Sequence, residues 1–279
     1  MTPEELSRRH LPTVLAAALA AGREILAVYA SDFAVAVKAD DSPLTAADTR
    51  AHGVIRDALA PIGLPLLSEE GRETAYAERR RWDRLWIVDP LDGTKEFVSR
   101  NGEFTVNIAL VADQRPVMGV IYEPVADRLY LGLGAEGAWR IEAAGRVLAG
   151  GREAGHWRQT ASRLPLARAA DRPFTVVGSR SHANAVLTDF VAMLRRQHDP
   201  LEFVAAGSAL KFCRLAEGGA DIYPRPAPTM EWDTAAGQGI LEAVGGRVMI
   251  WESDQPLTYN RPNLVNPGFV AFAPGVRIS

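Results

Sequence analysis

Cysteine is nearly absent from this sequence of 279 residues, in which Cys213 is the only one. A single thiol excludes an internal disulfide and any zinc or iron–sulfur site built from several cysteines. It is compatible with a reducing cytosol, and we expect Cys213 to be a small packed side chain rather than a nucleophile. The five histidines include no pair at the spacing of a helical metal site, so a histidine-based zinc site is not expected.

An excess of positive charge is also missing, because 34 Asp and Glu residues outnumber 31 Lys and Arg residues. This balance argues against general attachment to nucleic acid. Long apolar runs are lacking too: no stretch approaches the roughly 20 apolar residues of a spanning helix, so we expect a soluble, cytoplasmic protein with no transmembrane segment. Arg8 and Arg9 precede the apolar run 14–21 as in a secretory signal, but Glu4, Glu5 and the helical spacing of the run favour a mature helix.

What is present is the composition of an ordinary globular protein, with 47% hydrophobic and 23% charged residues. The length predicts two domains or one large domain. The first part, 1–143, is predicted to be an α+β domain with an antiparallel sheet. The second, 144–279, is predicted to be a smaller α/β domain, because strand and helix patterns alternate after the Gly-, Arg- and Pro-rich segment 143–173. Helices are expected near 14–29, 46–59, 183–195, 208–217 and 234–244, and strands near 66–67, 85–88, 104–111, 117–122, 128–133, 138–141, 174–177, 201–204 and 220–223.

One familiar motif fails on its context. Residues 132–137 match the dinucleotide pattern G-x-G-x-x-G by letter. That pattern needs a following helix, whereas 138–141 alternates like another strand, so these glycines are expected to form a turn. The sequence has no Walker A loop and no G-x-S-x-G elbow.

The most informative segment is 86–95, Trp-Ile-Val-Asp-Pro-Leu-Asp-Gly-Thr-Lys. Its apolar strand is expected to deliver Asp89 at its end, Pro90 to stop the strand, and Asp92 to open a helix. Carboxylate oxygens suit Mg²⁺, and the N–H groups of Gly93 and Thr94 suit a phosphate. The alternative is that Asp92 only caps a helix while Asp89 only ends a strand.

Two other acidic residues lie at the ends of expected elements. Glu69 follows the apolar pair 66–67, and Asp233 opens the helix expected from 234. Alone, Glu69 is typical of a surface charge and Asp233 of a helix cap. If both meet Asp89 and Asp92, the mutual repulsion would be costly without cations, and two or three Mg²⁺ ions would offset it.

In order and spacing, several segments resemble the lithium-sensitive, Mg²⁺-dependent phosphatases of the inositol monophosphatase superfamily. These segments are 41–48, 67–70, 86–94 and 232–237. Further segments are similar to the bacterial CysQ branch, the 3'(2'),5'-bisphosphate nucleotidases: 92–97, 101–110, 179–182, 207–213 and 223–225. The resemblance covers nearly the whole chain and implies a layered α-β-α-β-α fold. Glu231 departs from it, since an uncharged residue is expected there.

The resemblance also implies roles for individual residues. Mg²⁺ would be held by Glu69, Asp89, the Leu91 carbonyl, Asp92 and Asp233. Thr94, oriented by Asp48, would position the attacking water, and Glu69 would share in catalysis. The implied substrate contacts are Glu69, Leu91, Asp92, Gly93, Thr94, His182, Ser208, Lys211, Arg225 and Asp233.

A second phosphate of the substrate would need cations. Ser208, Lys211 and Arg214 recur at i, i+3 and i+6, so one helix face is expected to present all three. The resemblance adds Arg180, His182 and Arg225. The alternative for each cation is a solvated surface charge.

The expected function is hydrolysis of the 3'-phosphate of adenosine 3',5'-bisphosphate (PAP) to give AMP, and also of the sulfated analogue PAPS to give APS. An inositol phosphate or fructose bisphosphate phosphatase of the same superfamily is the alternative. A non-catalytic nucleotide or Mg²⁺ sensor is disfavoured, because every expected site residue is present. The sequence leaves open the number of Mg²⁺ ions, whether the protein is a monomer or a homodimer, and a loose association with the inner membrane.

Overall fold

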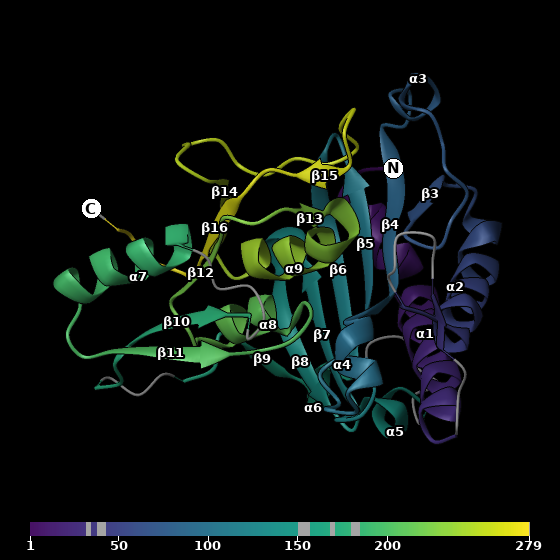
Figure 1. The fold of residues 1–279 in the computed structure, drawn as a ribbon. Helices are drawn as coiled ribbons and strands as arrows, with labels where there is room; N and C mark the ends of the chain where they lie inside the picture. Colours follow the sequence, from purple (N-terminus) through teal and green to yellow (C-terminus); the bar gives the residue numbers. More distant parts are fainter. Residues whose placement is uncertain (32–34, 38–42, 150–156, 168–170, 180–184, 279) are drawn as a thin grey trace.

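The backbone forms alternating layers of helices and sheets in the computed structural model, which describes residues 1–31, 35–37, 43–149, 157–167, 171–179 and 185–278. Figure 1 shows their order: a helical layer, a seven-stranded sheet, a second helical layer, a five-stranded sheet and an outer helix. This order confirms the layered α-β-α-β-α fold that the resemblance implied.

The larger sheet has the strand order β3-β4-β5-β6-β7-β8-β9, in which only β3 and β4 are parallel neighbours. Both of its faces are buried, and β4 shows why its sequence is continuously apolar. Trp86 and Val88 pack into the core on one face, whereas Leu85 and Ile87 pack into the core on the other. The strands are β3 (Leu66–Ser68), β4 (Arg84–Asp92), β5 (Thr105–Ala112), β6 (Arg115–Glu123), β7 (Arg128–Leu133), β8 (Gly137–Glu142) and β9 (Ser162–Leu164).

Helices α1 (Pro3–Tyr29) and α2 (Ala46–Leu59) cover one face of this sheet. A capping box begins α1: the Thr2 side chain accepts from the Glu5 N–H at 3.2 Å, and the Thr2 N–H donates to Glu5 Oε2 at 2.9 Å. Within the described ranges α1 is long and apolar enough to cross a membrane, which corrects the expectation from the sequence. More than half of its most apolar window is buried, so here it packs as a core helix.

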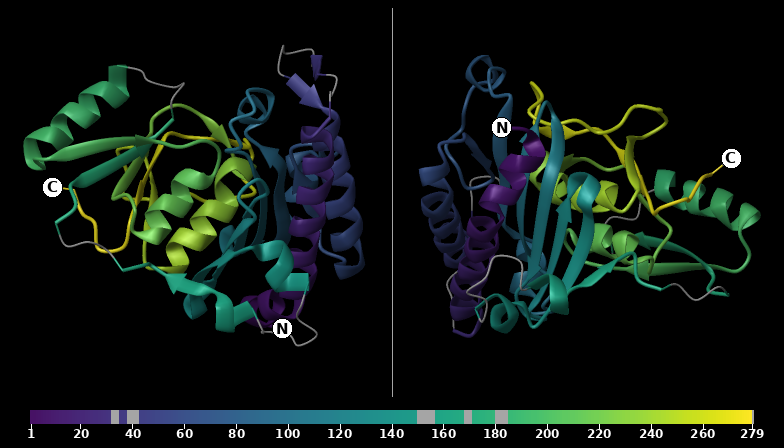
Figure 2. Two further views of the ribbon diagram at one scale, coloured as in Figure 1. Left: turned by 90° about the horizontal axis from the view of Figure 1, so that it is seen from below. Right: turned by 180° about the vertical axis from the view of Figure 1, so that it is seen from behind.

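Helices α8 (Leu210–Glu217) and α9 (Glu231–Ala243) lie between the two sheets. The smaller sheet has the order β11-β10-β12-β16-β14; β10 is parallel to β11 and β12, and β16 is antiparallel to both of its neighbours. Helix α7 (Ala185–Gln197) covers its outer face, and Figure 2 shows this sheet on the side of the molecule away from α1 and α2. The strands are β10 (Phe174–Gly178), β11 (Leu201–Ala205), β12 (Ile222–Arg225), β14 (Arg247–Ile250) and β16 (Phe269–Phe272).

Short elements complete the described chain: β1 (Val35–Val37), β2 (Pro43–Thr45), the 3₁₀ turns η1 (Ala60–Ile62) and η2 (Gly134–Glu136), α3 (Tyr76–Arg79), α4 (Thr94–Val98), α5 (Ala144–Ala149), α6 (Trp157–Thr160), β13 (Thr229–Met230) and β15 (Val265–Asn266). Of the glycines in the rejected dinucleotide motif, Gly134 opens the turn η2, whereas Gly132 lies in β7 and Gly137 begins β8. A strand therefore follows the motif, as predicted, but only one of the three glycines lies in the turn. Strand β9 pairs with β8, so the larger sheet extends to Leu164 and the predicted domain boundary at 143/144 is too early.

Candidate active site

Glu69 and Asp89 lie at neighbouring positions because β3 and β4 run parallel. Ser68 pairs with Val88, and the Glu69 N–H donates to the Val88 carbonyl at 3.2 Å. Glu69 is exposed, whereas Asp89 is buried with 1% exposure. The two strands therefore deliver one accessible and one enclosed carboxylate to the same edge of the sheet.

The end of β4 differs from the prediction, because Pro90 does not stop the strand. The ladder to β5 continues to Asp92 through an irregularity between Asp89 and Asp92, which accommodates the missing N–H of Pro90. The Leu91 N–H donates to Asp89 Oδ1 at 3.1 Å. Asp89 and Asp92 thus flank a bulge, which displaces the chain between them.

The turn after Asp92 depends on Gly93, which has φ of 94° and precedes α4. Only glycine fits well here: its conformation is left-handed, and a Cβ atom would lie 2.2 Å from Ser208 Oγ. Asp92 is therefore not the cap of this helix, which has no side-chain cap. Thr94 is the first residue of α4, half-buried and next to Gly93.

Asp92 is held by its neighbours on β5. Asn107 Nδ2 donates to Asp92 Oδ2 at 3.1 Å, and the Thr105 hydroxyl donates to Asn107 Oδ1 at 2.9 Å. Thr105 and Asn107 are both buried. Asn107 is not among the predicted site residues, although it is a polar residue within an apolar strand.

Asp233 comes from α9, which begins at Glu231, earlier than predicted. Asp233 therefore lies inside the first turn, where its Oδ2 accepts from the Met230 N–H at 2.8 Å. This contact is half of a capping box, with the third residue of the helix reaching back to the residue before it. Asp233 combines a cap contact with a place in the carboxylate cluster.

The acidic groups of this region raise one another's pKa values. Burial raises the pKa of Asp89 well above its ordinary value. Four nearby negative charges raise it further: those of Glu69, Asp92, Asp233 and Asp48. Burial and the charge of Asp92 raise the pKa of Asp233 to about 7. The five acidic residues form one cluster, called the carboxylate cluster below, and its repulsion favours a bound cation.

A cavity opens beside this cluster, between the turn after β4 and the start of α9. Among the residues predicted to contact substrate, it is lined by Asp92, Gly93, Ser208, Lys211, Arg225 and Asp233. Its other lining residues are Glu96, Ser179, Phe212, Tyr223, Thr229 and Thr234. Of the remaining predicted contacts, Glu69, Leu91 and Thr94 belong to the adjoining strand ends and turn, and His182 lies outside the described residues, as does Arg180.

Lys211 is buried at the cavity. Its Nζ donates to the Ser208 carbonyl at 2.6 Å and to the Ala206 carbonyl at 3.2 Å. Burial lowers its pKa to about 8, against the raising effect of Asp92. An ammonium group has three donors, so a third remains for an anion.

The single cationic face predicted for 208–214 is not formed. Ser208 lies before α8, which begins at Leu210, and its hydroxyl donates to the Asp92 and Glu103 carbonyls at 2.9 and 2.6 Å. Arg214 forms an ion pair with Glu217 and does not line the cavity. Arg225, at the end of β12, lines the cavity together with Lys211.

The donor chemistry of the site fits Mg²⁺. In the described part of the chain, no three His, Cys, Asp or Glu side chains are placed to hold a metal ion by themselves. Mg²⁺ rarely needs such a cage, because it keeps several waters and binds one or two carboxylates together with substrate phosphates. The carboxylate cluster offers hard oxygen ligands beside a cavity that Lys211 and Arg225 also line.

The sequence and the fold are similar to those of known proteins. The family model described as "Inositol monophosphatase family" matches residues 8–271. Over 255 residues the chain is 44% identical to the 3'(2'),5'-bisphosphate nucleotidase CysQ of Escherichia coli (strain K12), covering 89% of this chain and 94% of that protein. CysQ of Buchnera aphidicola is 37% identical over 279 residues, with 98% and 97% covered. The crystal structure of CysQ from Bacteroides thetaiotaomicron gives a TM-score of 0.84 at 46% identity, covering 94% of this chain and 96% of that one.

Proposed function

The chain belongs to the inositol monophosphatase family, and from this premise we propose that it is a Mg²⁺-dependent phosphatase that converts PAP to AMP and PAPS to APS. The observation that carries the proposal is the carboxylate cluster beside a cavity lined by Lys211 and Arg225. The CysQ relatives named above support the choice of substrate, because their names give a bisphosphate nucleotidase activity.

Each part of the site has a role in this proposal. Two or three Mg²⁺ ions would be held by Glu69, Asp89, the Leu91 carbonyl, Asp92 and Asp233. Bound Mg²⁺ lowers the pKa of a water and neutralises charge on the transferred phosphoryl group. The remaining steps belong to residues of the chain.

The N–H groups of Gly93 and Thr94 would bind phosphoryl oxygens, as free N–H groups at the start of a helix do. The Thr94 hydroxyl, oriented by Asp48, would hold the attacking water. Lys211 and Arg225 would bind the second phosphate, which an inositol monophosphate lacks. Water attacks phosphorus directly in this scheme, so no side chain is a nucleophile.

The same proposal covers the setting of the enzyme. We place it in the cytoplasm with a small-molecule substrate and no nucleic acid partner, because α1 packs as a core helix and the chain has no basic excess. We further propose a metal-binding unit around the larger sheet and a substrate-binding unit around the smaller sheet, with the boundary within 165–173.

Phosphate release from a panel of substrates tests the function. The purified chain is assayed with PAP, PAPS, an inositol monophosphate and fructose bisphosphate, with Mg²⁺ and with EDTA. We expect PAP to give the highest kcat/KM, EDTA to abolish turnover, and millimolar Li⁺ to inhibit it. Equal or better turnover of the inositol phosphate would exclude PAP as the preferred substrate.

Asp92→Asn tests the metal assignment. We expect kcat to fall by more than about 100-fold, exceeding the loss typical of residues that only support a metal ligand. The far-ultraviolet circular dichroism spectrum should stay unchanged, since Asn retains the shape of the side chain. Undiminished turnover would remove Asp92 from the set of ligands.

A further inference from the structure

Glu231 is an acidic side chain with 0% exposure at the first position of α9, two residues before Asp233. It does not line the cavity. Removing a carboxylate from water is costly unless donors surround it. The partners of Glu231 therefore show what this buried charge does.

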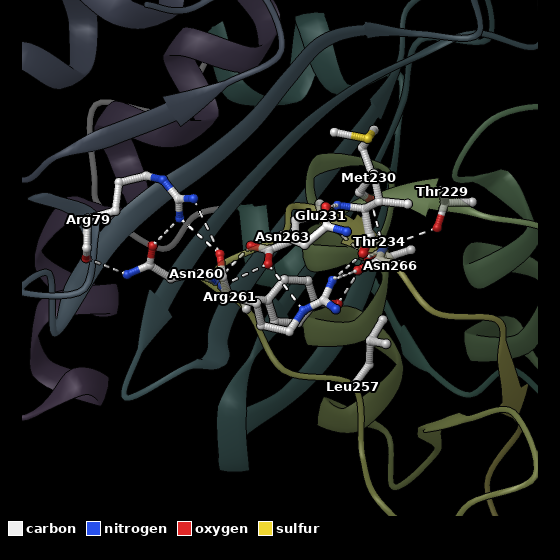
Figure 3. Close-up of polar contacts among 12 residues, drawn as sticks. Arg79, Thr229, Met230, Glu231, Thr234, Leu257, Asn260, Arg261, Asn263 and Asn266 are labelled. Carbon is white, nitrogen blue, oxygen red and sulfur yellow. Dashed lines mark hydrogen bonds and ion pairs between the residues drawn. The ribbon is translucent and has the colours of Figure 1, made fainter. Parts of the chain in front are cut away.

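The turn at 260–261 supplies those donors. Glu231 Oε2 accepts from the Asn260 N–H at 2.6 Å, and Oε1 accepts from the Arg261 N–H at 3.0 Å. Asn260 has φ of 58°, a left-handed conformation that Asn tolerates better than most residues, and successive N–H groups in such turns converge on one anion. Arg261 Nε adds an ion pair at 3.2 Å. Figure 3 shows Glu231 next to these two residues.

Asn260 extends the contact to the connection between β3 and β4, the strands that lead to Glu69 and Asp89. Arg79 Nη1 donates to Asn260 Oδ1 at 2.8 Å, and Asn260 Nδ2 donates to the Arg79 carbonyl at 2.7 Å. Arg79 ends α3, is 3% exposed and also donates to the Arg261 carbonyl. In Figure 3, this chain of contacts runs from Arg79 to the start of α9.

Asn266 holds the same helix start through a second set of contacts. Its Nδ2 donates to the Met230 carbonyl at 2.8 Å and to Thr234 Oγ1 at 2.9 Å, while Arg261 Nη2 donates to its Oδ1 at 2.6 Å. The Met230 N–H in turn donates to Asp233 Oδ2. Met230, whose N–H fixes one oxygen of Asp233, is thus itself held by Asn266.

We propose that Glu231 is a positioning residue for the reaction. Through Asn260 and Arg79 it fixes the first turn of α9, and with it Asp233, against the connection between β3 and β4, the strands that lead to Glu69 and Asp89. This inference rests on the proposed function, in which Asp233 is a Mg²⁺ ligand. The helix itself is packed between two sheets, so loss of the Glu231 charge displaces its first turn without preventing its formation.

Glu231→Gln in the full chain tests this role, because the amide keeps the shape of the side chain but loses its charge. We expect kcat with PAP to fall about 10- to 100-fold, as for other residues that support metal ligands. The Mg²⁺ concentration for half-maximal activity should rise about tenfold, and KM for PAP at saturating Mg²⁺ should stay within about twofold. Calorimetric titration with Mg²⁺ alone should show about tenfold weaker binding.

Glu242→Gln is the matched control on the same helix. Glu242 is a part-buried acid near the C-terminal end of α9, with Arg115 Nη2 and Gln238 Nε2 each at 2.8 Å. Its loss should lower Tm while Mg²⁺ affinity and kcat stay unchanged. Glu231 is a purely structural residue if its Gln variant also shows a lower Tm with unchanged Mg²⁺ affinity and kcat.

Arg79→Lys tests the same path from its far end, and decides the question if the Glu231 variant does not fold. Lysine keeps the charge but loses the guanidinium fork, in which Nε donates to the Thr74 carbonyl while Nη1 donates to Asn260 and Nη2 to the Arg261 carbonyl. Mg²⁺ affinity should fall in the same direction, and unchanged affinity would overturn the inference. If the chain without substitutions binds Mg²⁺ but hydrolyses none of the substrates, only the proposed function fails. The effect of each variant on Mg²⁺ affinity can still be measured by calorimetry.

Discussion

At the scale of single residues, the site depends on side chains that hold other side chains. Asn107 bonds Asp92 with its amide nitrogen and accepts from Thr105 with its amide oxygen. Both groups of the amide are engaged, so the side chain cannot turn without losing a buried hydrogen bond. Asp92 therefore reaches the cavity with one oxygen already fixed.

Asn107→Ala removes this support. We expect kcat/KM for PAP to fall about 10- to 100-fold, and the free energy of unfolding to fall by about 1–3 kcal/mol, because the Thr105 hydroxyl loses its acceptor. Steady-state kinetics and urea unfolding measure the two effects. Thr105→Val, which removes only the outer hydrogen bond, should cost less activity, and full activity of the Ala variant would contradict the role of Asn107.

The sequence predicts some of these residues and not others, for a physical reason. Asp89 and Glu69 could be predicted because each follows an apolar run of residues, and the parallel pairing of β3 and β4 sets them together. The contact between Arg79 and Asn260 could not be predicted, because 181 positions of sequence separate the two residues. Asn107 left a local signal, as the polar member of an apolar strand.

At the scale of elements, α9 packs directly against the backbone of two strands. A Cβ atom on Gly119 of β6 would lie 2.2 Å from the Ala236 carbonyl oxygen, and one on Gly132 of β7 would lie 2.5 Å from Ile240 Cα. Backbone atoms cannot yield as a flexible side chain can. The two glycines therefore set the distance between the larger sheet and the helix that carries Asp233.

Gly132→Ala should push α9 away from the sheet. We expect the free energy of unfolding to fall by about 1–3 kcal/mol through overpacking, and kcat to fall because Asp233 moves with the helix. The matched control is Gly53→Ala in α2, where a Cβ atom meets nothing within 4 Å; it should raise stability by about 0.5–1 kcal/mol. Denaturant unfolding and steady-state kinetics of both variants measure these effects. Equal changes in stability and kcat for the two variants would refute the role of Gly132.

Local patterns predict elements well where the pattern is self-contained. Helix α2 (Ala46–Leu59) and strand β7 (Arg128–Leu133) have the predicted bounds. Strand β4 passes Pro90 because a bulge accommodates the missing N–H, and α9 starts early because distant N–H groups satisfy Glu231. The edge strand β14 was missed because its ladder partner, β16, lies beyond an intervening loop.

At the scale of the whole molecule, the carboxylate cluster links stability to pH. The pKa of Asp233 is about 7 in the folded chain against 3.8 ordinarily. Between these values the folded chain binds more protons than the unfolded chain, so the free energy of unfolding falls as pH rises. The contribution of protonated Asp233 to the free energy of unfolding is fully present below about pH 4 and is lost by about pH 7.

Urea unfolding in EDTA at pH 5 and at pH 7.5 tests this linkage. From pH 5 to pH 7.5, the free energy of unfolding of the chain without substitutions should fall more than that of the Asp233→Asn variant. Because both chains share all other titrating groups, the difference between them isolates the contribution of Asp233. Saturating Mg²⁺ at pH 7.5 should restore stability, since it binds only the folded cluster. If the free energy of unfolding depends on pH in the same way for both chains, the proposed repulsion between Asp233 and the other carboxylates is contradicted.

The position of Asp233 late in the amino-acid sequence has a consequence for biosynthesis. A nascent polypeptide leaving the ribosome carries Asp48, Glu69, Asp89 and Asp92 long before the helix that holds the fifth acid is translated. In the proposed site Asp233 is a Mg²⁺ ligand, so we expect the early segment to lack one of its metal ligands until α9 inserts between the sheets. We therefore expect a chain that stops before α9 to be inactive.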